Sequence, residues 1–71
     1  MDKIVAKQGA IGYAVFKNGV LVDSPKNLRD LVSRLHYFGI IGSSQRDFLR
    51  ELDETGRAEE EMPEVKIRQV S

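Results

Sequence analysis

The sequence predicts an α+β fold with a β-hairpin or three-strand meander, a helical hairpin packed on it and a C-terminal β-strand. Three observations predict this fold. They are an Asn-Gly pair between two apolar runs, two amphipathic segments around a glycine-bracketed turn, and a final stretch of alternating polar and apolar residues. Seventy-one residues make one small domain. Its predicted parts are a hairpin region (1–23), a helical hairpin (24–56), an acidic connector (57–63) and a C-terminal strand or tail (64–71).

The N-terminal hairpin is predicted from residues 11–16 and 20–22, which are rich in branched and aromatic side chains. Asn18-Gly19 separates the two runs, and both central residues of a tight hairpin turn need positive φ. A shorter β-compatible run at residues 4–6 is either a first strand or an ordered lead-in. The turn predicts three cross-strand pairs, namely Lys17 with Val20, Phe16 with Leu21 and Val15 with Val22.

Both faces of this hairpin are largely apolar, unlike those of a sheet with one wet side. Gly12 and Ala14 are small, so we expect a helix to approach closely on their face. The opposite face carries larger residues, which need another cover such as a second copy of the chain. These larger residues are Ile11, Tyr13, Val15, Val20 and Val22.

Ser24-Pro25 predicts the start of the first helix, because serine is a favoured N-cap and proline is favoured in the first turn. An apolar stripe at helical spacing follows, and Gly39 is a natural stop. The stripe consists of Leu28, Leu31, Val32, Leu35 and Phe38.

The second helix is predicted after Ile40 and Ile41, which are apolar enough that both should tuck between the helices. Ser44 with Asp47 three residues later is typical of a capping box at a helix start. Thr55-Gly56 is the predicted end.

Residues 57–63 contain three adjacent glutamates and end in proline, so we expect a charged connector there. Residues 64–70 alternate polar and apolar side chains, which predicts a strand with one wet face. Val65 and Ile67 would lie on its apolar side. Such a strand can join the hairpin, pair with another chain or order on meeting a partner.

Composition excludes several kinds of chemistry. The chain has no cysteine and a single histidine, which rules out disulfides, thiolate metal sites and a zinc site built from imidazoles. No nucleophile motif surrounds any serine, so His36 is interpreted as a partner of the helix dipole or as an interface residue. Neither Gly-x-x-Gly run leads into a phosphate-binding loop. We therefore predict a non-enzyme without catalytic residues, metal or cofactor.

Location and charge are the next constraints. No apolar run approaches the ~20 residues that cross a bilayer, and no secretion signal is evident, so a cytoplasmic protein without membrane contact is expected. The formal net charge is zero. The first 50 residues are nevertheless mildly basic and the remainder acidic, which allows attraction within or between copies.

The order of strand 20–22, helix, Gly39-Ile40-Ile41-Gly42, helix and strand 65–70 resembles the KH module, which binds RNA and single strands. In KH domains such a loop clamps backbone nucleotides. The middle positions of that loop are usually polar or basic, whereas here they are isoleucines. A DNA-reading helix-turn-helix with Gly39 in its turn is a related alternative. In both, exposed arginines would contact the nucleic acid.

The sequence best fits a small non-enzymatic regulator of the inhibitor or adaptor type, which binds another protein and self-associates as a homodimer. This size is similar to that of small regulators carried by mobile elements. Nucleic-acid binding through the basic helical pair is the alternative. The candidate interaction residues are Arg29, Arg34, Arg46, Arg50, Tyr13, Val65 and Ile67.

Overall fold

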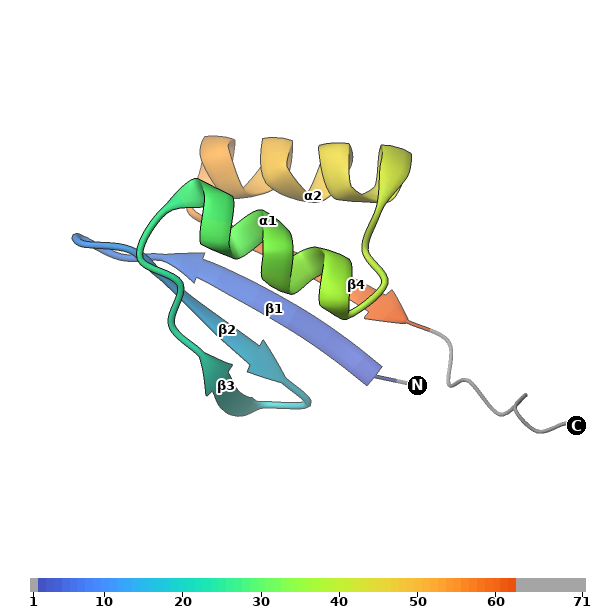
Figure 1. Cartoon of the computed structure of the whole chain (residues 1–71), viewed down its shortest axis with the longest axis horizontal. Helices are drawn as coiled ribbons and strands as arrows, with labels where there is room; N and C mark the ends of the chain where they lie inside the picture. The colour runs from blue at the N-terminus through green and yellow to red at the C-terminus, as the bar shows by residue number, and fades with distance from the viewer. Residues whose placement is uncertain (1, 63–71) are drawn as a thin grey trace, which may run out of the picture.

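The computed structural model describes residues 2–62. Its four strands form one antiparallel sheet in the order β3-β2-β1-β4, and both helices cover the same face of that sheet (Figure 1). The α+β class, the three-strand meander and the helical hairpin are confirmed. The elements are β1 (Asp2–Gln8), β2 (Tyr13–Lys17), β3 (Val20–Asp23), α1 (Leu28–Tyr37), α2 (Gly42–Thr55) and β4 (Arg57–Met62).

The core lies between the helices and the covered face of the sheet. Its largest buried side chain is Phe48 of α2, which packs with Leu31 and Leu35 of α1 above the two central strands. Apolar burial drives this assembly, because about 25 cal/mol is gained per Å² removed from water. The buried cluster is Ile4, Ala6, Val15, Leu31, Leu35, Ile40, Phe48, Leu52 and Ala58.

The hairpin turn forms as predicted, with Asn18 at φ 53° and Gly19 at φ 85°. Two of the three predicted pairs are confirmed, namely Lys17 with Val20 and Phe16 with Leu21. The third is wrong, because Val15 pairs with Asp23 and Val22 is an extra residue in a β-bulge.

The helices cover the opposite face of the hairpin from the one predicted. Val15 is fully buried under them, whereas Phe16 lies on the uncovered face and is only partly buried. The reason lies in the other strands, since Ala6 of β1 pairs with both Val15 and Ala58 and so continues the apolar surface across three strands. The hairpin alone does not reveal this alignment.

Helix α1 begins three residues later than predicted. Its N-cap is Asn27, whose side-chain Oδ1 accepts a 2.9 Å hydrogen bond from the N–H of Asp30. Ser24 lies before the helix, and Pro25 is buried between β3 and α1 rather than in a first turn. The Pro25 carbonyl accepts a 2.8 Å hydrogen bond from the N–H of Tyr13, which holds this segment extended against the sheet.

We expect Asn27→Ala to lower the free energy of unfolding by about 1 kcal/mol, because an N-cap side chain satisfies an otherwise unpaired helix donor. In a domain of this size that loss lowers Tm by roughly 4–8 °C. Thermal unfolding followed by circular dichroism measures it. Ser24→Ala is the control and should change Tm little; a larger drop for Ser24→Ala than for Asn27→Ala would contradict the observed start of α1.

The turn between the helices is partly as predicted. Gly39 has φ 90° and follows Phe38, the C-cap of α1, and Ile40 is completely buried. Ile41 is half exposed instead of tucked in, because it occupies the N-cap of α2. The predicted capping box is also wrong: α2 begins at Gly42, which places Ser44 inside the first turn. The predicted end at Gly56 is confirmed, with φ 80°.

The predicted acidic connector is a strand. Residues 57–62 form β4, which pairs with β1 along its whole length. Glutamates have low strand propensity, but tertiary contacts outweigh it here, since Ala58 is buried and Met62 packs against the core. The strand predicted at 64–70 lies outside the described residues. Among those described, no helix is long and apolar enough to cross a membrane.

Candidate functional site: the β3 edge

Strand β3 is one edge of the sheet, and β4 is the other. Helix α2 packs against β4, at the edge opposite β3. Strand β3 carries three consecutive exposed aliphatic residues: Val20 is 64 % exposed, Leu21 53 % and Val22 46 %. An edge strand presents unpaired N–H and C=O groups along its outer side. Within residues 2–62, aliphatic side chains on both faces and an unpaired backbone edge therefore occur together at one place.

The end of β3 is fixed to α1 by an ion pair. Arg34 Nε donates a 2.6 Å hydrogen bond to Oδ2 of Asp23, and the other carboxylate oxygen accepts the N–H of Ser24 at 2.9 Å. The guanidinium also lies 5.2 Å from the ring centroid of Tyr37. These contacts line an open groove of about 560 Å³ between β3 and α1. The end of the edge strand thus contacts α1 beside a groove with mixed polar and aromatic walls.

The uncovered face of the sheet is different in character, because its own charges pair with one another. Lys3 Nζ lies 3.4 Å and Arg57 Nη2 3.0 Å from the carboxylate of Glu59. The ammonium of Lys7 lies 5.3 Å from the centre of the Phe16 ring. The hydrogen bond from Arg57, supported by Lys3, lowers the pKa of Glu59 against the opposing effect of desolvation. This face therefore combines exposed ion pairs with the apolar side chains of Val5 and Phe16, around an open hollow of about 650 Å³.

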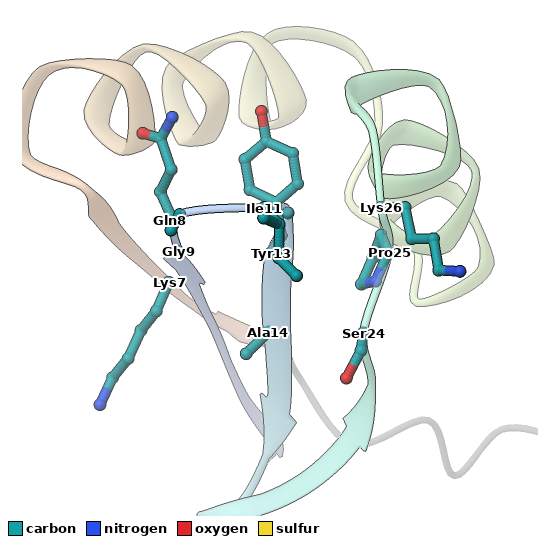
Figure 2. Close-up of a pocket in the computed structure, with 11 residues that line it drawn as sticks. Lys7, Gln8, Gly9, Ile11, Tyr13, Ala14, Ser24, Pro25 and Lys26 are labelled. Carbon is teal, nitrogen blue, oxygen red and sulfur yellow. The ribbon is translucent and has the colours of Figure 1, made fainter.

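A hollow of about 320 Å³ lies beside the loop that joins β1 and β2 (Figure 2). Figure 2 shows Gln8 and Tyr13 pointing toward the helices and Lys7 pointing away from them. Ile11 is 91 % exposed at the loop tip, so it does not enclose the hollow. Among the described residues that line the hollow, only Lys7 and Lys26 are charged. The hollow is wide open and its small size is at the lower limit for a ligand site.

The predicted basic residues do not form one surface. Arg34 is bound to Asp23, while Arg29 is exposed elsewhere on the first turn of α1. Arg46 and Arg50 are exposed on α2, but that helix also carries four carboxylates: Asp47, Glu51, Asp53 and Glu54. Phosphate binding needs a surplus of positive charge, which α2 does not have.

Tyr13 is half buried and packs against the core, so its ring contributes more to stability than to an outer surface. Val65 and Ile67 lie outside the described residues. His36 is exposed in the last turn of α1, the end of a helix at which basic side chains interact favourably with the helix dipole. Val20 and Val22 were expected to need a cover, but neither they nor Leu21 are among the site residues predicted from the sequence. Their run of three aliphatics was a signal, but its meaning depends on β3 being an edge.

Comparison of the chain with family models, with curated proteins and with solved structures finds no match. The site is therefore interpreted from its own residues.

Proposed function

We propose that this chain is a non-enzymatic protein-binding module, of the regulator type, that receives an extended segment of a partner on the edge of β3. The observation that carries the proposal is the coincidence of three exposed aliphatic residues with a strand edge that no other strand of residues 2–62 covers. In strand addition the backbone hydrogen bonds supply affinity, and alternate side chains supply specificity. The lack of cysteine fits a reducing compartment and supports a cytoplasmic location.

The contacts that hold both ends of β3 support this proposal further. A strand that is already held in place loses little conformational freedom when a second strand pairs with it, which lowers the cost of binding. Asp23 and Arg34 provide that attachment at one end of β3, and the tight turn at Asn18-Gly19 provides it at the other. The incoming segment would also reach Tyr37, which is 75 % exposed beside the groove.

Site-specific photo-cross-linking in the source cell tests the proposal. A photoreactive amino acid replaces Val22 in one variant and Glu51, on the exposed side of α2, in a control variant. We expect covalent adducts from position 22 and none, or far fewer, from position 51. Equal adduct yields at the two positions, or none at position 22, would overturn the assignment of this edge as a docking site.

A further inference from the structure

We infer that the strand received on the β3 edge is β3 of a second copy of this chain, so that two chains share one continuous antiparallel sheet. This inference rests on the proposed function and names its partner. Most soluble homo-oligomers are two-fold dimers, in which the same patch of both copies forms the interface. When β3 pairs antiparallel with β3 of a second copy, each residue must therefore be compatible with the residue that this antiparallel pairing places opposite it.

Strand β3 meets that requirement. Beyond the tight turn, the alternation of an antiparallel ladder directs the backbone N–H and C=O of Leu21 to the outer side. Pairing centred on Leu21 places it opposite Leu21 of the second copy and places Val20 opposite Val22 of the second copy. All of these contacts are aliphatic. No like charges oppose one another, and such opposition is what usually destabilises cross-strand pairs.

The edge also lacks the charged residues that normally prevent pairing. Natural edge strands are protected by lysine, proline or inward-pointing charges, and residues 20–22 contain none. The nearest charge on the strand, Asp23, is bound by Arg34 of α1. The bulge at Val22 is the one protective feature present, and it shortens the flat part of the edge. The pairing is therefore short, and we expect the association to be weak and reversible.

Properties of the whole chain also favour a second copy. The formal net charge is zero, so two copies do not repel each other as proteins with a large net charge do. The core is small, no cysteine is available for a disulfide, and no cluster of three metal-binding side chains occurs within residues 2–62. The core of a domain of this size supplies only about 3–5 kcal/mol, so self-association would add to a small margin of stability. A second copy would supply this stability by burying Val20, Leu21 and Val22.

Analytical ultracentrifugation of the full chain, from about 1 to several hundred micromolar, tests the inference. We expect a reversible monomer–dimer equilibrium for the wild type. Leu21→Lys should weaken it at least tenfold, because a lysine would be buried against its own copy. Ile41→Lys is the matched control, since Ile41 is 51 % exposed and Leu21 53 %. The control should dimerise like the wild type.

Circular dichroism and proton NMR spectra report whether Leu21→Lys still folds. If it does not, Val20→Lys replaces it, because Val20 is more exposed and its side chain contributes less to the fold. A wild type that stays monomeric at several hundred micromolar overturns the inference. Equal weakening by Leu21→Lys and Ile41→Lys also overturns it, because the interface would then lie elsewhere.

Cross-linking from position 22 separates this inference from the proposed function. An adduct with twice the mass of one chain supports both. An adduct with a different protein overturns the inference and leaves the function standing. An internal link from position 22 to residues 63–71 overturns the inference as well, because the edge would then be covered by the chain's own end. Dimers in the centrifuge without any adduct from position 22 overturn the proposed site and the dimer geometry together.

Discussion

Gly12→Ala should largely unfold the protein. A Cβ atom at position 12 would lie 2.7 Å from the carbonyl oxygen of Pro25 and 3.2 Å from Cα of Lys26, and both are backbone atoms that cannot rotate away. Gly12 also has φ 154°, a conformation that residues with side chains rarely adopt. The same Pro25 oxygen accepts the N–H of Tyr13 at 2.8 Å, so relief of the clash breaks that hydrogen bond.

Overpacking and backbone strain together make this loss about 2–4 kcal/mol. A single core in a domain of this size supplies only about 3–5 kcal/mol. Urea unfolding followed by circular dichroism measures the difference. Gly9→Ala in the same loop is the matched control, because its Cβ would meet only the Gly12 carbonyl oxygen at an ordinary 3.5 Å. It should change stability by less than about 1 kcal/mol. Similar losses for the two variants would refute the close packing at Gly12.

Phe48→Ala should destabilise the protein as severely, for a different reason. Phe48 is the largest fully buried side chain, at 2 % exposure, and it joins α2 to the sheet and to α1. Replacement by alanine loses the burial of the ring and leaves a cavity, which typically costs about 3–5 kcal/mol. We expect loss of cooperative thermal unfolding and of dispersed NMR signals.

Two further variants make the Phe48 result interpretable. Phe48→Leu keeps most of the volume and should lose less than about 1.5 kcal/mol, so it remains foldable and measurable. Ile41→Ala removes a half-exposed side chain and should change stability by no more than about 1 kcal/mol. If Phe48→Ala unfolded at the same temperature as Ile41→Ala, the core would not be centred on Phe48.

Local signals in the sequence gave correct predictions where the chain itself determines the conformation. The turn at Asn18-Gly19 and the helix ends at Gly39 and Gly56 require positive φ, and the residue types there supply it. The predicted start of α1 was wrong because several nearby residues can cap a helix, whereas α2 begins after Ile41 without any side-chain cap. Asn27 caps α1 instead of Ser24 because Pro25 packs against the sheet. That packing is a tertiary contact, which the local sequence does not reveal.

The assignment of β4 and of the candidate site depended on long-range contacts. Residues 57–62 look like a solvated linker in isolation, but Lys3 and Arg57 pair with Glu59 and so stabilise a glutamate inside a strand. The apolar run of β3 was visible in the sequence. Its position at an edge became apparent only once β1 was seen to pair with β4 on its other side. Sequence patterns cannot supply the order of strands in a sheet.

The place of β1 in the sheet has a consequence for the order in which the protein assembles. Its pairing with β2 closes a loop of only a few residues, whereas its pairing with β4 must close the whole chain between residues 8 and 57. Closing a longer loop costs more conformational entropy, so we expect the meander to form before β4 joins it. During that interval the far side of β1 is an open edge. Lys3 and Lys7 flank Val5 on that strand, and charges so placed discourage aggregation until β4 arrives.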